Sequence, residues 1–340
     1  MATIEHLLVE TFGAFIGKHS ERLFVSKGKE TLVQAPLMHL RYVTIASPGV
    51  SISADAIKEC CERGIPMYFI DKNDHFATLF SPGLVGTVKT RRAQFAAYHD
   101  GRGTQIGLCI AAAKINNQVA TLKYIAKSRK ESQPEVYQIL HEAAIEALGY
   151  ADRLSTLADQ NLDDVCNSLM AFEANAASQY WGALRAVVPE DYSWTKRIGR
   201  GAIDPVNSLL NYGYAMLRGR VEQAITNAGM DSYAGFIHAD RPGKHSLTFD
   251  MMEEFRSVAV DRLVVGLVNR KYLVPITDHG QLEDGVKKDY SNKVTEHLKA
   301  TVRYEGARFT IEYIIQNQAR RLAAYLRSDA VAYQPYKAEW

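Results

Sequence analysis

The sequence has few of the features that mark secreted, membrane-bound or cysteine-rich metal proteins. Its 340 residues include only four cysteines, Cys60, Cys61, Cys109 and Cys166. They form no C-x-x-C pair, which argues against a zinc knuckle and against a disulfide framework, and we expect reduced thiols. The amino terminus MATIEHLLVETFGAF has no basic stretch before a long apolar run, and no segment approaches ~18 consecutive apolar residues. We therefore expect a soluble, cytoplasmic protein with no membrane partner.

The net charge is also small, at +2 with a pI of about 8.2. This value argues against a polycationic protein that wraps nucleic acid, such as a histone. The charges are nevertheless distributed unevenly. Residues 84–130 contain nine Lys or Arg and a single acid, Asp100, whereas residues 131–173 contain nine acids and a single arginine. A chain of near-neutral total charge thus includes a strongly basic segment that is suited to phosphate contacts.

The length exceeds one typical hydrophobic core, so we expect two domains. The first part of the chain alternates short β-rich segments with turn residues, and it includes one helix, 53–64, with Ser53 as N-cap and Gly64 as the stop. The predicted strands are HLLVE, AFIGK, RLFVS, TLVQAP, YVTIAS, MYFID and FATLF. These segments predict a small β-rich domain over residues 1–85.

After residue 86 the hydrophobic period changes to that of helices, with Asp204-Pro205 as a good N-cap and first-turn pair. The predicted helices cover 90–99, 103–128, 134–147, 152–160, 166–187, 205–228, 249–270, 291–302 and 310–327. The predicted fold class is therefore α+β multidomain: a small β-rich N-terminal domain is followed by a larger all-α domain, residues 86–340.

Glu173 interrupts the apolar stripe of one predicted helix, SLMAFEANAASQYWGALR. Leu169, Ala176, Tyr180 and Leu184 share its face, so the carboxylate needs a cationic partner. A metal ion is one candidate. A salt bridge to an arginine, such as Arg185 or Arg197, is the simpler interpretation of this residue alone.

The segment GFIHADRPGKHSLTFDMMEEFR holds a loop histidine, His238, before three clustered acids. Asp250 and Glu253 have the D-x-x-E spacing of a capping box, in which Asp250 caps a helix. A lone loop histidine is usually only a hydrogen-bonding residue. Capping does not account for a histidine held nearby by an Arg-Pro-Gly turn.

Glu173, His238 and Glu253 together form a nitrogen and oxygen ligand set that would leave positions for water and substrate. Two carboxylates about 4 Å apart repel by roughly 4 kcal/mol at an effective dielectric of 20, and a divalent cation removes that penalty. This donor set suits Mg²⁺ or Mn²⁺ bound with phosphate better than zinc, which favours thiolates or several histidines. Such a metal supports phosphodiester chemistry.

Basic residues for holding phosphate lie in or near the same stretches: Arg256, Lys244, Arg241, Arg220 and Arg218. For each of them taken singly, a solvated surface charge is the ordinary alternative.

Six segments, in this order, resemble the Cas1 family, the CRISPR-associated endonucleases and integrases of spacer acquisition. They are RRAQFAAYHD, KINNQ, AFEANAASQYW, DPVNSLLNYGYAMLRGRV, GFIHADRPGKHSLTFDMMEEFRSVAVDRLV and QARRLAAYL. The resemblance covers nearly the whole chain.

The resemblance implies a helical catalytic domain, a homodimer made through the β-rich domain, and a site of Glu173, His238 and Glu253 that binds Mg²⁺ or Mn²⁺. Asp250 would be an auxiliary or alternative ligand, and Arg256 would touch the scissile phosphate. It further implies a Cas2-family partner protein and double-stranded DNA, as prespacer and as CRISPR repeat. The 3′-hydroxyl of the prespacer would attack a phosphodiester at the repeat boundary.

Two other functions remain open from the sequence. A metal-dependent nuclease that uses water would cleave branched or single-stranded nucleic acid with the same ligands and yield no joined product. A non-catalytic nucleic-acid scaffold would use its acids only to cap helices, and its DNA binding would not respond to Mn²⁺.

Overall fold

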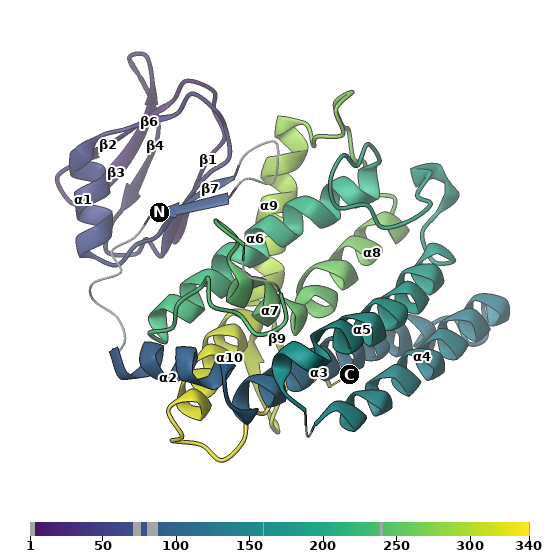
Figure 1. Ribbon diagram of the computed structural model, residues 1–340. Coiled ribbons are helices and arrows are strands. Elements are labelled where there is room, and N and C mark those ends of the chain that lie inside the picture. Colours follow the sequence, from purple (N-terminus) through teal and green to yellow (C-terminus); the bar gives the residue numbers. More distant parts are fainter. Residues whose placement is uncertain (1–3, 71–75, 80–87, 159, 239–240, 340) are drawn as a thin grey trace. The chain divides into compact units, whose positions relative to one another are not determined.

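The computed structural model describes residues 4–70, 76–79, 88–158, 160–238 and 241–339 (Figure 1). The chain forms two compact units. One comprises the N-terminal region to residue 84 together with residues 283–289, and the other comprises the rest. The predicted domain boundary, between residues 85 and 86, lies outside the described residues. The prediction also assigned residues 283–289 to the helical domain, whereas they pack with the N-terminal unit.

The N-terminal unit contains two four-stranded sheets, ordered β1-β5-β7-β8 and β4-β3-β2-β6. All seven predicted strands are present, and the two-residue strand β6 was missed because it has no pattern of its own. The strands are β1 His6–Val9, β2 Phe15–His19, β3 Arg22–Lys27, β4 Glu30–Pro36, β5 Tyr42–Ile45, β6 Ser51–Ile52, β7 Met67–Ile70 and β8 Phe76–Leu79. Strand β5 pairs in parallel with β1 and β7 and is buried throughout, which explains its continuous apolar sequence.

Helix α1, Ala54–Glu62, begins and ends as the sequence predicts. The Ser53 hydroxyl accepts from the Ala56 N–H, and Gly64 adopts φ +65°, a left-handed conformation that favours glycine. Cys60 is buried with the apolar strand residues in the core of this unit. All four cysteines are free thiols, as expected.

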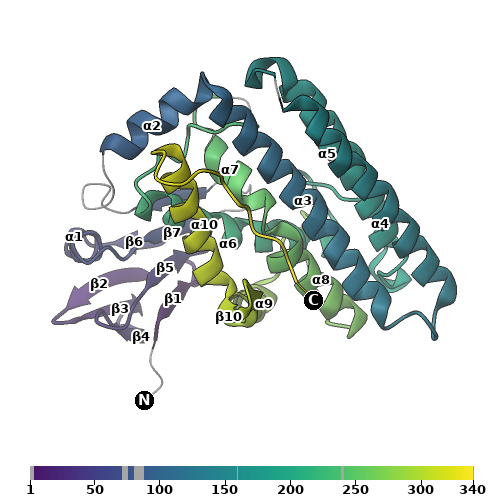
Figure 2. The same ribbon diagram turned by 90° about the horizontal axis from the view of Figure 1, so that it is seen from below.

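The second unit is mostly helical. Helices α3, α4 and α5 pack against one another, and they lie side by side in Figure 2. Helix α6 packs against α7 and α10. The helices are α2 Val88–Tyr98, α3 Gly101–Lys127, α4 Pro134–Leu154, α5 Leu162–Arg185, α6 Pro205–Asn227, α7 Ser246–Glu253, α8 Arg262–Asn269, α9 Asp284–Lys299 and α10 Ile311–Leu326. Helix α6 begins as predicted, with Asp204 accepting from the Asn207 N–H at 2.8 Å.

The predicted fold class is confirmed, because a β-rich N-terminal unit is followed by a mostly helical one. Two details of the helical unit differ from the prediction. The domain is not entirely helical, because β9 Thr301–Tyr304 and β10 Ala307–Thr310 form an antiparallel hairpin. The single helix predicted over 249–270 is divided into α7, a π-helical turn Ser257–Asp261, and α8. The turn buries the Asp261 carboxylate, which accepts hydrogen bonds from the hydroxyls of Tyr180 and Tyr214. These bonds compensate a buried acid within an otherwise apolar stretch.

Hydropathy places no membrane-spanning helix anywhere in the described part of the chain.

Candidate functional site

Glu173 lies on the apolar face of α5, as its spacing predicts. Leu169, Ala176, Tyr180 and Leu184 on that face are buried, and only 16% of the Glu173 side chain is exposed. Its cationic partner is Lys114 of α3, not Arg185 or Arg197. The simple salt-bridge interpretation was therefore right about the kind of contact and wrong about the residue.

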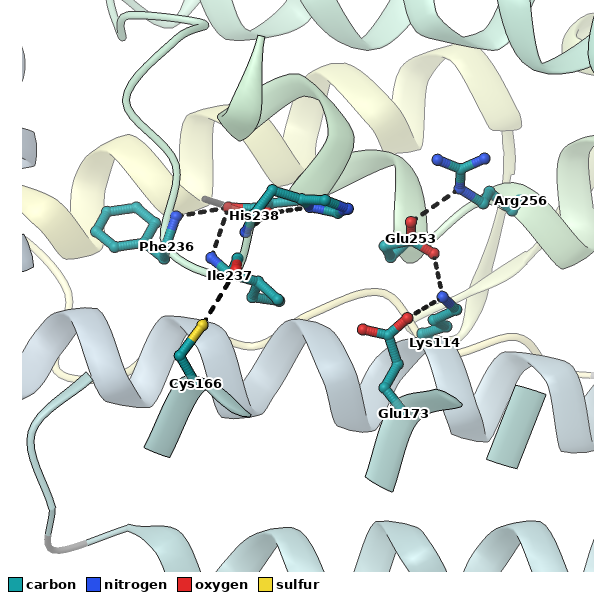
Figure 3. A network of polar contacts seen from close by, with 9 residues as sticks. Lys114, Cys166, Glu173, Phe236, Ile237, His238, Glu253 and Arg256 are labelled. Carbon is teal, nitrogen blue, oxygen red and sulfur yellow. Dashed lines mark hydrogen bonds and ion pairs between the residues drawn. The ribbon is translucent and has the colours of Figure 1, made fainter. Parts of the chain in front are cut away.

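Lys114 also contacts a second carboxylate, that of Glu253, at the end of α7 (Figure 3). The Lys114 Nζ lies 2.7 Å from the Glu253 Oε2, and 14% of the lysine side chain is exposed. The other oxygen of Glu253, Oε1, lies 3.0 Å from the Arg256 Nε. A single ammonium group thus holds together carboxylates from two helices that are separated by about eighty residues of sequence.

These charges control the ionisation of the site. Burial raises the pKa of Glu253, but the effects of the nearby Arg256, Lys114 and His238 outweigh it and bring that pKa down to about 2. Burial lowers the pKa of Lys114, but the carboxylates of Glu253 and Glu173 outweigh burial and raise that pKa above its usual value. Both groups are therefore charged at neutral pH.

His238 is held by Asp250, which is fully buried inside α7. The Asp250 Oδ1 lies 2.6 Å from the His238 Nδ1 and accepts from the His238 backbone N–H at 3.1 Å. Its Oδ2 accepts from the N–H groups of Phe236 and Ile237 at 2.6 and 3.1 Å. A carboxylate on Nδ1 leaves Nε2 as the ring nitrogen that can bind another group, which is the usual arrangement behind a metal-bound histidine.

The structure contradicts the predicted capping role of Asp250. It is not a helix cap, because α7 begins four residues earlier, at Ser246. Both of its oxygens bind the His238 loop, and its role as an auxiliary or alternative metal ligand stays a prediction. Gly235 permits this approach: a Cβ there would lie 2.7 Å from the Asp250 Oδ2 and from the Ser246 backbone.

The same loop is attached to α5 on its other side, where the Cys166 thiol donates to the Ile237 carbonyl at 3.3 Å (Figure 3). The ring of Phe249 lies 5.8 Å from that of His238 and carries the Arg218 guanidinium at 5.0 Å on its face. Figure 3 shows the His238 ring directed toward Glu253. The imidazole therefore has a defined orientation on the side of the two carboxylates.

Glu254, which directly follows α7, binds the C-terminal segment of the chain. It is fully buried and accepts from the Tyr333 hydroxyl and, at 2.8 Å, from the Tyr336 N–H. Asn117, in the KINNQ segment, donates to the carbonyls of Glu254 and Tyr336 at 2.7 and 3.0 Å. These contacts attach the C-terminal segment behind the site.

Stability should depend on pH through Glu254. Burial raises the pKa of Glu254 from 4.5 to about 7, against the lowering effects of Tyr333 and Tyr336. The folded state therefore favours the protonated acid, and its stability falls as pH rises from about 4.5 to 7. At about 1.4 kcal/mol per pKa unit, the loss is roughly 3 kcal/mol relative to Glu254→Gln, which cannot ionise. Urea unfolding of both proteins from pH 4.5 to 7.5 measures it, and a difference that is constant with pH would contradict it.

The residues predicted to contact phosphate differ in their position and exposure. Arg256 adjoins Glu253, and its guanidinium lies 4.7 Å above the Tyr214 ring. Lys244 is partly exposed, in the turn that leads to α7. Arg220 is not placed for the predicted role, because its side chain is only 9% exposed and its Nε lies 3.6 Å from the Glu312 Oε1. The side chain of Arg220 therefore faces α10 and not solvent.

The prediction overlooked Lys114 as a site residue. The signal was present, because Lys114 is the one charge within the otherwise apolar run LCIAAAKI of α3, and an isolated charge in such a run needs a partner. The prediction also missed Asp261 with its two tyrosines, for which no sequence pattern exists.

The donor atoms of Glu173, Glu253 and His238 would suit a divalent metal, although these side chains are not arranged around a common point. Within the described ranges, no three His, Cys, Asp or Glu side chains are already spaced as a metal cage. Glu173 and Glu253 nevertheless meet at one cation, and the buried Glu253 Oε2 makes an ion pair but no hydrogen bond. Two carboxylates and an oriented imidazole would be the residues that hold Mg²⁺ or Mn²⁺.

The fold and site define a two-domain α+β protein whose helical unit brings two carboxylates, a lysine, an arginine and a carboxylate-bound histidine to one place. Comparison with known proteins agrees. Residues 7–295 match the model of the family described as CRISPR associated protein Cas1. The chain is 34% identical to a CRISPR-associated endonuclease Cas1 of Archaeoglobus fulgidus, covering 98% of this chain and 99% of that one. It is 32% identical to one of Francisella tularensis subsp. novicida, covering 99% and 100%.

Solved structures show the same fold. A casposase bound to integration product aligns with a TM-score of 0.82 at 23% identity, over 99% of this chain and 95% of that one. A Cas1 protein from Thermotoga maritima aligns with a TM-score of 0.77 at 18% identity, over 97% and 99%. The chain belongs to the Cas1 family.

Proposed function

We propose that this protein is a divalent-metal-dependent DNA endonuclease and integrase that inserts short DNA fragments into a CRISPR array. The observation that carries the proposal is the meeting of Glu173 and Glu253 at one cation beside the oriented His238. The names of its relatives support it, since they include CRISPR-associated endonucleases and a casposase bound to integration product.

The residues of the chain suggest how each would act. A bound Mg²⁺ or Mn²⁺ supplies positive charge for a phosphate oxygen and acidifies an attacking hydroxyl. Asp250 keeps the His238 ring in one orientation and one tautomer. Arg256, which is only 23% exposed and lies beside Glu253, would neutralise charge on the scissile phosphate. No protein nucleophile is required for a direct transfer between oxygens.

Partners follow from the same comparisons. A Cas6-RT-Cas1–Cas2 complex and a Cas1–DNA complex are among the structures with this fold. We include a Cas2-family protein and double-stranded DNA among the proposed partners. We also propose a homodimer through the N-terminal unit, which exposes the large apolar side chains of Phe12 and Met38 by 67% and 77%.

Integration and hydrolytic cleavage would use the same site, but they give different products. With Mn²⁺ and a Cas2-family partner, the purified protein is expected to join a labelled oligonucleotide with a 3′-hydroxyl to a plasmid that carries a CRISPR repeat. Gel analysis should show joined strands with Mn²⁺ and none with EDTA. Cleaved strands without joined ones would contradict integration and favour the hydrolytic nuclease. DNA binding that does not respond to Mn²⁺, with neither cleaved nor joined strands, would favour the non-catalytic scaffold.

A further inference from the structure

Lys114 occupies the position at which a divalent ion would be expected. Its ammonium contacts both Glu173 and Glu253, and these are two of the three residues proposed to hold the metal. All three side chains are at least four-fifths buried, so water does little to weaken the contacts. Without this cation, two carboxylates would face each other in a poorly solvated place.

Among the described residues, the acids that act electrostatically on Lys114 are Glu253 and Glu173, and the cation Arg256 repels it. The Arg256 Nε already neutralises the Glu253 Oε1 from the other side. Glu253 therefore contacts two cations, Lys114 and Arg256. Lys114 also contacts Glu173.

We infer that Lys114 acts as an internal counter-ion, which keeps the two carboxylates together when no metal is bound and competes with Mg²⁺ or Mn²⁺ for them. A divalent ion between Glu173 and Glu253 requires the ammonium to move away, because two cations cannot occupy one position. Lys114 is in this respect a positioning residue: it preserves the ligand arrangement while weakening metal affinity. The inference rests on the proposed metal site.

Removing the charge separates these two effects. In Lys114→Met, with no competing ammonium, Mn²⁺ should bind at least about tenfold more tightly, corresponding to ~1.4 kcal/mol. The metal-free variant should melt at a lower temperature than the wild type, because the buried Glu173 loses its cation and Glu253 keeps only Arg256. Saturating Mn²⁺ should raise its melting temperature by more than it raises that of the wild type.

A matched control is available on the same helix. Lys123 is an exposed residue of α3, and Lys123→Met should leave both the Mn²⁺ affinity and the metal-free melting temperature unchanged. Affinity is read by calorimetry or by the electron paramagnetic resonance of free Mn²⁺, so the test does not depend on catalysis. Equal Mn²⁺ affinity in Lys114→Met and the wild type would overturn the competition. Absence of Mn²⁺ binding in every variant, wild type included, would overturn the metal site itself and this inference with it.

A second measurement uses the wild-type protein, in case Lys114→Met does not fold. Brief reductive methylation followed by mass spectrometry reports how accessible each lysine amine is. The extent of Lys114 modification should change when Mn²⁺ is added, since the ammonium leaves its two carboxylates, whereas that of Lys123 should stay the same. Unchanged modification of Lys114 at saturating Mn²⁺ would contradict displacement.

Discussion

Replacement of His238 by alanine is expected to lower the rate of strand joining by about a hundredfold to a thousandfold, the range seen when one preorganised catalytic group is lost. The imidazole is fixed through Nδ1 by Asp250, and its ring is directed toward Glu253, so alanine removes Nε2, the ring nitrogen that is left to act. Joining of a labelled 3′-hydroxyl oligonucleotide to plasmid DNA in Mn²⁺ measures the loss.

His141→Ala is the matched control, because His141 is an exposed histidine of α4 that stacks on Tyr137 away from the site residues. This variant should join DNA at the wild-type rate. Undiminished joining by His238→Ala, in a protein that melts at the wild-type temperature, would show that the assigned site is not the site of reaction.

Replacement of Asp250 by alanine should have the largest effect on stability. It removes the acceptor of three backbone N–H groups and of the His238 ring, all at a fully buried position. Each buried donor left without a partner costs about 1–3 kcal/mol, so the free energy of unfolding should fall by roughly 4 kcal/mol. Asp250→Asn retains an oxygen acceptor and should lose about half as much. Urea unfolding measures both losses.

The exposed Asp152 of α4 provides the control, and Asp152→Ala should stay within about 0.5 kcal/mol of the wild type. A double variant also tests the role of Asp250. If Asp250 acts on the reaction through His238, then Asp250→Ala should reduce joining little further once His238 is already alanine. Additive losses would indicate that Asp250 acts on the reaction by another route.

Much of the architecture could be predicted from periodicity and end signals. Ser53, Asp204 and Gly64 marked helix ends because a cap is a local hydrogen bond or a local backbone conformation. The seven strands were equally visible, since turn residues separate them. Parallel pairing of β5 with β1 and β7, by contrast, joins segments that are far apart in sequence, and no local pattern encodes it.

The error over Asp250 shows the limit of a local pattern. A D-x-x-E spacing is consistent with a helix cap, yet the buried carboxylate finds better donors in the loop at Phe236, Ile237 and His238. Where a helix begins therefore depended on a contact with a segment more than ten residues away. The division of the 249–270 helix at its π-helical turn has the same cause, because Asp261 binds Tyr180 and Tyr214 of other helices.

The sequence by itself determined the residue types of the site, since a glutamate within an apolar stripe and a histidine before an acidic helix are visible without coordinates. It also determined the two-part organisation of the chain, through the change of hydrophobic period. Only the tertiary structure decided which charges meet. The packing of α3 against α5 and α7 brings Lys114 to Glu173 and Glu253. The packing of α6 against α10 brings Arg220 to Glu312. Partners of buried charges are set by distances across the fold, which depend on how all the helices pack together.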